Sequence, residues 1–278
     1  MSKLAFLWAA SLALVYAQAA LADSCRFNAT RTAAIEGGPV RKVIVIAGAG
    51  DLIVRSDKTL TAPRASGRAC ASSQKQLDAI TLETHREGDT LYIKTVLPEI
   101  GDSFSFGQNV SLDLTVDLPQ VIATEIEDSS GDAEISDIGA AIVTDSSGDL
   151  RLNEIHGDLS ITDSSGGIRI DSVAGNVQIR DSSGDVDVAD VTGNLDIPLD
   201  SSGDLRLSRV GGNVIIGTDS SGDIVVQQVQ RDVTIGRDSS GDISVTDVAG
   251  NLSIGADSSG DIDHDRVLGK MDLPRGHR

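Results

Sequence analysis

The chain has 278 residues and carries 42 Asp and Glu against 23 Lys and Arg, a formal net charge of −19. Nucleic acids and anionic membrane surfaces attract basic patches, so this charge argues against both as partners. Hydrophobic residues make up 40% of the chain but aromatic residues only 3%. This composition indicates a core of small aliphatic side chains rather than large rings.

The first segment, residues 1–22, has the features of a signal peptide. Lys3 supplies the positive charge, and residues 4–17 form an apolar stretch that is too short to span a bilayer comfortably. Small residues precede Asp23, where we expect the mature chain to begin; cleavage after Ala19 and a retained anchor are the alternatives. We therefore predict an exported protein in the periplasm, at the cell surface or secreted, without a transmembrane segment in its mature chain.

Two cysteines, Cys25 and Cys70, follow this segment. An even number of cysteines in an exported chain predicts one disulfide, here closing a loop of about 45 residues. The surrounding residues 23–110 are less regular than the rest, with two expected strands at 80–84 and 90–96. We interpret this region as a disulfide-stapled N-terminal cap that includes the first irregular coils.

A four-residue motif, Asp-Ser-Ser-Gly, governs the remainder of the chain, residues 111–278. It begins at Asp128, Asp145, Asp163, Asp181, Asp200, Asp219, Asp238 and Asp257. The spacing of 17 to 19 residues is the signature of a solenoid, in which each repeat buries its apolar face against its neighbours.

Each repeat contains two short apolar-x-apolar segments, such as Ile243 with Val245 and Leu252 with Ile254. This period of two is typical of a strand with one buried face, and Gly, Asn and Asp between the segments favour tight turns. Two strands and two turns leave no room for a helix. We therefore predict an all-β, single-stranded parallel β-helix of about eight regular coils. In the fifth coil the inward positions are Leu205, Leu207, Val210, Val214 and Ile216.

Three stretches carry a resemblance to a known family: AGAGDLIV at 47–54, GRACASS at 67–73 and SLDLTVDLP at 111–119. Together with the repeats, they resemble the bacterial putative-adhesin family, a domain of unknown function in exported proteins. The resemblance implies a right-handed parallel β-helix and a location in the envelope or outside the cell. It supplies no catalytic residues.

Stacked coils place the eight motif aspartates in one file, where neighbouring carboxylates repel each other. We expect each of them to be held in its turn by backbone N–H groups of the following serines. The alternative is a calcium ion between coils, with these aspartates as ligands. The calcium ligands would then be Asp128, Asp145, Asp163, Asp181, Asp200, Asp219, Asp238 and Asp257. Against calcium, the glycine-rich motif of calcium-binding nonapeptide rolls is absent from the sequence.

Two further files and two histidines complete the candidate residues. A second Asp file runs from Asp132 to Asp261 and is interrupted at Gly167, and a file of Asn and Asp occupies the other turn. His156 lies in a turn position that favours a structural role. For His264 we favour a degraded inward position over a metal site with the neighbouring aspartates.

We therefore expect an exported, non-enzymatic β-helix with a structural, adhesive or surface-interaction role in the bacterial envelope. Its partner is an unidentified envelope or extracellular component, we expect it to be a monomer, and we assign it no cofactor or catalytic residue. A calcium-binding acidic solenoid is the second hypothesis. A glycan-active enzyme is the third, and the lack of long insertions between repeats argues against it.

Export predicts a simple spectroscopic property of the purified mature protein. Trp8 is the chain's single tryptophan and lies in the segment expected to be removed. The mature protein should therefore fluoresce as a tyrosine protein, through Tyr92, and contain no free thiol. An emission spectrum and a thiol titration test this, and tryptophan emission would show that the first segment is retained.

Overall fold

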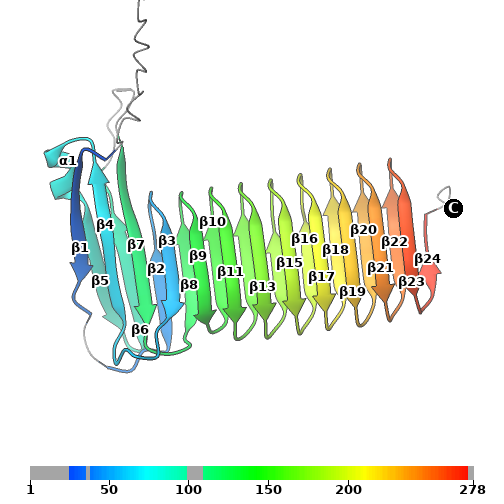
Figure 1. The fold of residues 1–278 in the computed structure, drawn as a ribbon, viewed down its shortest axis with the longest axis horizontal. Helices are drawn as coiled ribbons and strands as arrows, with labels where there is room; N and C mark the ends of the chain where they lie inside the picture. The colour runs from blue at the N-terminus through cyan, green and yellow to red at the C-terminus, as the bar shows by residue number, and fades with distance from the viewer. Residues whose placement is uncertain (1–24, 36–37, 99–108, 275–278) are drawn as a thin grey trace, which may run out of the picture.

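The fold is that of a computed structural model, which describes residues 25–35, 38–98 and 109–274. Two long β-sheets face each other along an elongated body, and the coils follow one another toward the C-terminal end (Figure 1). The predicted signal peptide and its cleavage site lie outside the described residues. Within those residues, no helix is long and apolar enough to cross a membrane.

The strands belong to two sheets, here called sheet A and sheet B. In spatial order, sheet A consists of β1 (Phe27–Ala33), β4 (Arg64–Ala71), β7 (Val110–Leu118), β3 (Leu52–Ser56), β9 (Ala133–Ile138), β11 (Leu150–Ile155), β13 (Ile168–Val173), β15 (Val186–Val191), β17 (Leu205–Val210), β19 (Ile224–Val229), β21 (Ile243–Val248) and β23 (Ile262–Val267). Sheet B consists of β5 (Thr81–Glu87), β6 (Thr90–Val96), β2 (Lys42–Ile46), β8 (Ala123–Asp128), β10 (Ala141–Asp145), β12 (Leu159–Asp163), β14 (Val177–Arg180), β16 (Leu195–Leu199), β18 (Val214–Asp219), β20 (Val233–Asp238), β22 (Leu252–Asp257) and β24 (Met271–Asp272).

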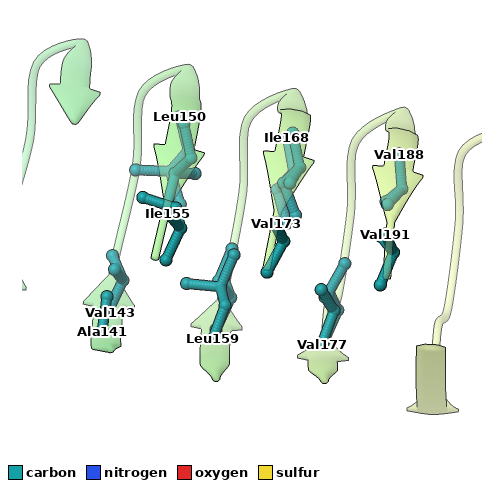
Figure 2. Packing of buried hydrophobic residues seen from close by; sticks show 14 of the residues in the cluster. Ala141, Val143, Leu150, Ile155, Leu159, Ile168, Val173, Val177, Val188 and Val191 are labelled. Carbon is teal, nitrogen blue, oxygen red and sulfur yellow. The ribbon is translucent and has the colours of Figure 1, made fainter. Parts of the chain in front are cut away.

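Successive coils stack in parallel and in register, so equivalent residues of neighbouring repeats lie side by side. Strand β17 pairs with β19, which places Leu205 beside Ile224 and Leu207 beside Val226. Inward side chains from both sheets meet between the sheets and form one continuous aliphatic core (Figure 2). The prediction of an all-β parallel solenoid with two strands per coil is thus confirmed.

The inward positions predicted for the fifth coil are correct. Their side chains are at most 1% exposed: Leu205, Leu207, Val210, Val214 and Ile216. A period of two explains Leu205 and Leu207 but not Val210, which lies three positions after Leu207 and would otherwise point outward. The residue before it, Arg209, has a φ of 56°, and this left-handed bend turns the chain so that Val210 points inward again.

One such left-handed residue occurs in every coil from β9 to β23. None of them is glycine: Asp137, Glu154, Ser172, Asp190, Arg209, Gln228, Asp247 and Arg266. Sequence analysis missed these bends, because Asp is tolerated in this conformation but Glu, Gln and Arg are uncommon there. The stacking of neighbouring coils imposes the conformation on them.

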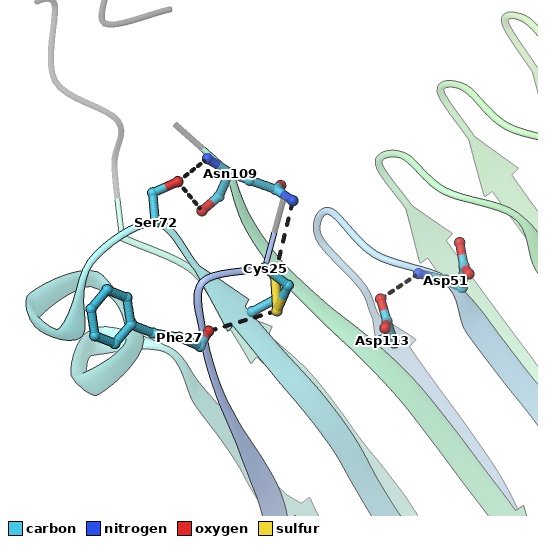
Figure 3. Close-up of a disulfide and its surroundings, with 7 residues drawn as sticks. Cys25, Phe27, Asp51, Ser72, Asn109 and Asp113 are labelled. Carbon is cyan, nitrogen blue, oxygen red and sulfur yellow. Dashed lines mark hydrogen bonds between the residues drawn. A yellow bond between two sulfur atoms is a disulfide. The ribbon is translucent and has the colours of Figure 1, made fainter. Parts of the chain in front are cut away.

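The N-terminal end is closed by strands that run antiparallel. Strand β4 pairs antiparallel with β1 and β7, and β5 with β6. The two strands expected at 80–84 and 90–96 are thus present as β5 and β6, although β5 runs from Thr81 to Glu87. The short helix α1 (Gln74–Ala79) begins after the capping residue Ser73. The disulfide between Cys25 and Cys70 joins the start of β1 to the end of β4, as predicted from the cysteine count (Figure 3).

The chain does not build its coils in sequence order at this end. Strands β2 and β3 form an early coil, but this coil lies between the coil of β6 and β7 and the coil of β8 and β9. Residues 42–56 are therefore enclosed on both sides by segments that follow them in the sequence. Their core residues Val43, Val45, Leu52 and Val54 have no exposed surface.

The C-terminal coil has a neighbour on one side only within the described residues. His264 pairs with Val245, which is the inward register position that we predicted for it. Its side chain is nevertheless exposed, because no described coil covers that face. In the sequence this coil is followed by Pro274, Arg275 and Arg278, and proline and charge at an open end are expected to block further strand pairing. Residues 275–278 lie outside the described residues.

The register predicts opposite outcomes for two adjacent valines of β19. Val226 has no exposed surface, whereas Val225 lies on the outer face of sheet A. Val226→Asp should cost about 3 kcal/mol or more, because it buries a charge among aliphatic side chains. Val225→Asp should cost less than about 1 kcal/mol. Urea unfolding of both variants measures the difference, and equal losses would contradict the register.

Candidate functional site

The motif aspartates form the predicted file along the solenoid. Asp145 lies between Asp128 and Asp163 in the parallel pairing of sheet B. Sequence analysis did not predict that the file is buried, although a signal was present: Leu159, Ile161 and Asp163 continue one period of two. Seven members are between 0 and 4% exposed: Asp128, Asp145, Asp163, Asp181, Asp200, Asp219 and Asp238. We call these seven the buried Asp file.

Hydrogen bonds in the turns are those that the turn interpretation predicts. Asp163 Oδ1 accepts from the backbone N–H groups of Ser164, at 2.7 Å, and Ser165, at 3.3 Å. The Ser165 hydroxyl donates to the carbonyl of Ser146 in the preceding coil, at 3.1 Å. This turn is thereby closed within itself and tied to its neighbour, and the same serine-to-carboxylate bond occurs in the turns of Asp128, Asp145, Asp181, Asp219 and Asp238 but not in that of Asp200.

The glycine that ends each motif is required by both conformation and space. Gly203 has a φ of 126°, and a Cβ at this position would lie 2.0 Å from the carbonyl oxygen of Gly184 in the preceding turn. Side chains other than hydrogen rarely adopt such a φ. The turns can therefore stack closely only because each one has glycine at this point.

The second carboxylate oxygen of the buried Asp file has a different environment. In all seven residues, Oδ2 is closed off from solvent and has no hydrogen-bond donor. Burial raises the pKa of Asp200 to about 7, and the neighbouring carboxyls of Asp219 and Asp181 add to the shift. Burial followed by the charge of Asp145 likewise raises the pKa of Asp128 to about 7.

The pKa values of the other members of the buried Asp file are raised as well. Burial first, and adjacent carboxyls second, raise the pKa of Asp163 and of Asp219 to about 6. Burial is also the main cause that raises the pKa of Asp145, Asp181 and Asp238. The buried Asp file therefore holds protons at a higher pH than ordinary aspartates do.

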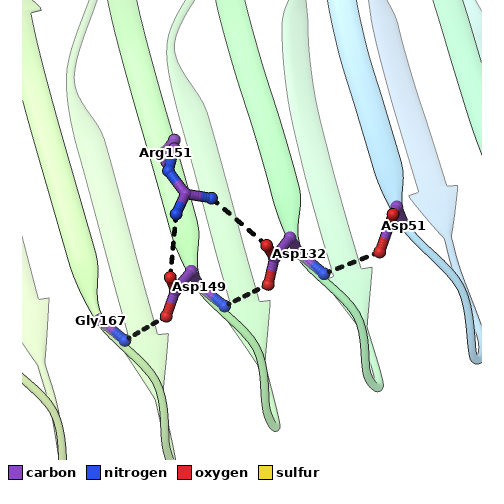
Figure 4. Close-up of polar contacts among 5 residues, drawn as sticks. All are labelled: Asp51, Asp132, Asp149, Arg151 and Gly167. Atoms are coloured by element: carbon purple, nitrogen blue, oxygen red, sulfur yellow. Dashed lines mark hydrogen bonds and ion pairs between the residues drawn. The ribbon is translucent and has the colours of Figure 1, made fainter. Parts of the chain in front are cut away.

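The second Asp file lies at the surface and links coils through the backbone. Asp132 Oδ1 accepts from the N–H of Asp149 at 3.1 Å, and Asp149 Oδ1 accepts from the N–H of Gly167 at 3.1 Å (Figure 4). Gly167 has no carboxylate, so the chain of bonds stops there, as the sequence indicated. It resumes where Asp185 accepts from the N–H of Asp204 at 3.0 Å.

Two arginines neutralise part of this file. Arg151 bridges Asp132 and Asp149 (Figure 4), and Arg206 donates to Asp204 at 2.6 Å and to Asp185 at 3.2 Å. The backbone N–H of Asp204 and then Arg206 hold the pKa of Asp185 below its usual range. The carboxylate of Asp185 is thus favoured in its ionised form, in contrast to the buried Asp file.

The Asn and Asp file in the other turn repeats the backbone ladder. Asn176 Oδ1 accepts from the N–H of Asn194 at 3.0 Å, and Asn194 Oδ1 from the N–H of Asn213 at 2.9 Å. The same bond continues through Asp232 to Asn251. These side chains therefore have a structural role, because each one ties its turn to the backbone of the next coil.

His156, for which the sequence favours a structural role, belongs to a surface ion-pair cluster. Its Nε2 lies 2.7 Å from Asp137 Oδ1, and Lys58 approaches the other oxygen of Asp137 at 3.4 Å. Burial opposes the ionisation of Asp137, but hydrogen bonds from His156 and Lys58 hold its pKa below the usual range. The contacts support the structural role that we favoured for His156.

A groove of about 780 Å³ runs across the outer face of sheet B. Its floor mixes aliphatic and amide side chains, and Ile142 and Ile215 are 52% and 44% exposed. Lys42 and Glu125 pair with each other at one end, at 2.6 Å. Asp158 and Asp196 accept hydrogen bonds from the side-chain amides of Asn176 and Gln178. Sequence analysis missed this groove because outward residues differ from coil to coil.

A cation site is not evident from the arrangement of ligands. In residues 25–35, 38–98 and 109–274, no three His, Cys, Asp or Glu side chains are placed to hold a metal ion. This applies to the acidic residues around His264 as well as to the Asp files. Calcium binding by the eight motif aspartates stays a prediction.

Together, the fold and its polar files define a non-globular class of protein: a β-solenoid in which most coils repeat the inter-coil bonds of their neighbours. The chain belongs to the Toastrack DUF4097 family, whose model matches residues 55–265. This match confirms the resemblance drawn from the sequence to an adhesin-like domain of unknown function. A comparison with curated proteins finds no match.

Solved structures similar to this chain share little sequence with it. One is a "putative lipid binding protein" from Parabacteroides distasonis, 18% identical, with 88% of this chain and 97% of that chain covered and a TM-score of 0.47. Another is a "putative adhesin" from Bacteroides fragilis, 12% identical, with 90% and 98% covered and a TM-score of 0.38. A "putative cell adhesion protein" from Clostridium sporogenes is 12% identical, with 88% and 99% covered and a TM-score of 0.31.

Two glycine substitutions test the stacked turns. Gly203→Ala should cost about 3 kcal/mol or more, because it combines an unfavourable φ with a clash against the backbone of the adjacent turn. Gly88→Ala is the control, since Gly88 also has a positive φ but no atom lies within 4 Å of the point where its Cβ would be. Its cost should be about 1 kcal/mol. Similar thermal stabilities of the two variants would contradict the close stacking.

Proposed function

We propose that this protein is an exported, non-enzymatic solenoid of the bacterial envelope that binds another protein through the groove on sheet B. The observation that carries the proposal is the exposure of Ile142 and Ile215 on a rigid sheet face. Isolated apolar side chains are common on surfaces, but here both line one continuous groove. A solenoid presents such a face without a change of shape on binding.

The non-enzymatic part of the proposal is supported by the connections between strands. From β8 to β24, no connection is longer than five residues. Enzymes of β-helical architecture need side loops that build a cleft and bring catalytic groups together. The groove described above is instead formed by the flat face of the sheet.

Charge indicates the kind of partner. Residues 121–263 contain 28 acidic and 7 basic residues, and within the groove Asp158 and Asp196 hydrogen-bond to neutral amides rather than to a base. Complementary potentials favour association between proteins. We therefore infer an extended segment of a basic protein, with aliphatic side chains that contact Ile142 and Ile215.

Binding of two synthetic peptides tests the groove directly. The purified mature protein should bind an alternating Lys-Val peptide but not a Glu-Val peptide, and added salt should weaken binding. The variant Ile142→Ser with Ile215→Ser should bind the Lys-Val peptide about tenfold more weakly, because it loses apolar contact. Fluorescence polarisation measures both affinities.

The matched control is Val225→Ser, which changes an aliphatic residue on the outer face of sheet A. It should bind like the unchanged protein. If the groove variant and the control bind the peptide equally, the groove is not the binding surface. If no basic peptide binds and an envelope extract yields only acidic or glycan ligands, the proposed partner class is wrong.

A further inference from the structure

One oxygen of each carboxyl in the buried Asp file is buried without a hydrogen-bond partner. Each of its seven carboxyls uses Oδ2 for no bond, although that atom is inaccessible to water. A buried oxygen that carries charge and lacks a donor is strongly unfavourable. Because the coils stack in register, the nearest group of the same kind is the carboxyl of the adjacent coil.

No ion pair between described residues involves a member of the buried Asp file. For Asp128, Asp163, Asp200, Asp219 and Asp238, the charged neighbours that contribute most to the raised pKa are aspartates. They are other motif aspartates, Asp204 and Asp223 of the second Asp file, and Asp51, whose Oδ1 accepts from the N–H of Asp132. The dominant charges around the buried Asp file are therefore negative.

The choice of residue is a second, independent observation. The exposed file in the other turn uses Asn and Asp interchangeably, with Asn176, Asn194 and Asn213 beside Asp158 and Asp232. An asparagine could accept the same Ser N–H bonds in the motif turn. Even so, all eight motifs have aspartate. What aspartate offers and asparagine lacks is an oxygen that can gain or lose a proton.

A proton fits the space between two carboxyls better than a metal ion does. Calcium takes six to eight oxygen ligands and magnesium six, several of them commonly water. The Oδ2 atoms of the buried Asp file are closed off from solvent, so water cannot complete such a shell, and among the described residues no three acidic side chains are placed to hold a metal ion. A single proton needs only one donor oxygen and one acceptor oxygen, as in paired carboxyls that share a proton.

We propose that the buried Asp file is a proton-binding site, in which protonated carboxyls donate hydrogen bonds to carboxyls of the adjacent coil. The proton moves from water to an Oδ2 atom on folding, and no other bond changes. The protons belong to the file as a coupled set rather than to single residues. The file thus links the stability of the solenoid to the pH of its compartment.

The direction of this linkage follows from the raised pKa values. The folded carboxyls hold protons up to about pH 6 or 7, whereas unfolded aspartates lose theirs near 3.8. Folding therefore takes up protons between these values, and stability falls as the pH rises through this window. For Asp163 alone, folding should be on the order of 100-fold less favourable at pH 8 than at pH 4. Ion-paired carboxylates such as Asp190 have a lowered pKa and act in the opposite direction, but only at more acidic pH.

The experiment compares two triple variants of the mature protein at fixed ionic strength. The first, Asp181→Asn with Asp200→Asn and Asp219→Asn, replaces members of the buried Asp file with neutral residues of the same shape. The control, Asp132→Asn with Asp242→Asn and Asp261→Asn, removes the same charge from the second Asp file at positions that are not among the charged neighbours named above. Melting temperatures are measured from pH 5 to pH 8, and the histidines are unchanged in both variants.

We expect the unchanged protein and the control to lose stability as the pH rises from 5 to 8. The buried-file variant should lose less and should melt at a higher temperature than the unchanged protein at pH 8. Carbon-13 NMR of aspartate carboxyls in the unchanged protein should show groups that titrate above pH 5, which keeps the proposal testable if the variant does not fold.

Two results would overturn the proposal. One is a set of aspartate carboxyls that all titrate near pH 4, together with equal pH dependence of the two variants. The other is selective stabilisation at pH 8 by millimolar calcium, relative to magnesium and to EDTA, that is lost in the buried-file variant. That second result would show that the file binds calcium instead, and neither result depends on the groove or its partner.

Discussion

In-register stacking of parallel coils is the constraint on which the rest of this structure depends. Backbone hydrogen bonds fix each coil on the next, so paired residues lie beside their equivalents above and below, with one shift of register where β14 pairs with β16. For aliphatic residues this is favourable, because Leu207 between Val188 and Val226 extends one apolar file. For charged residues in-register stacking is unfavourable, because it places like charges next to each other. The polar chemistry of the protein is a set of solutions to this one problem.

Three different solutions occur, and solvent exposure separates them. At the surface, carboxylates and amides accept the N–H of the next coil, as Asp204 does for Asp223 and Asn194 for Asn213. Where the outer strand position is arginine, as at Arg151 and Arg206, a guanidinium lies between two carboxylates and offsets their repulsion. In the interior neither solution is available, because no described ion pair reaches the buried Asp file and its Oδ2 atoms are closed off from solvent without a hydrogen-bond donor. Protonation is the remaining way to reduce the repulsion between carboxyls of adjacent coils.

The period of the motif and the apolar-x-apolar segments were enough to predict the fold, because a strand of period two and a short repeat permit few other arrangements. The burial of Asp163 could also have been predicted, since it continues the period of Leu159 and Ile161; its polarity favoured a surface turn instead. Other features had no local signal. The left-handed conformation of Arg209 is imposed by stacking, and the position of β2 and β3 between later coils depends on pairings between distant segments. The groove likewise depends on side chains from several coils.

Positions that repeat and positions that vary have different roles in such a molecule. Inward residues, turn glycines and the Asp and Asn files are similar in every coil because stacking imposes the same demand at each level. The outward positions of sheet B face no such demand, and they read Glu125, Ile142, Ser160, Gln178, Asp196 and Ile215 along the groove. A partner that recognised only repeated features could bind at any level of the stack. Recognition at one place therefore requires the residues that differ, and these lie on the outer faces of the sheets.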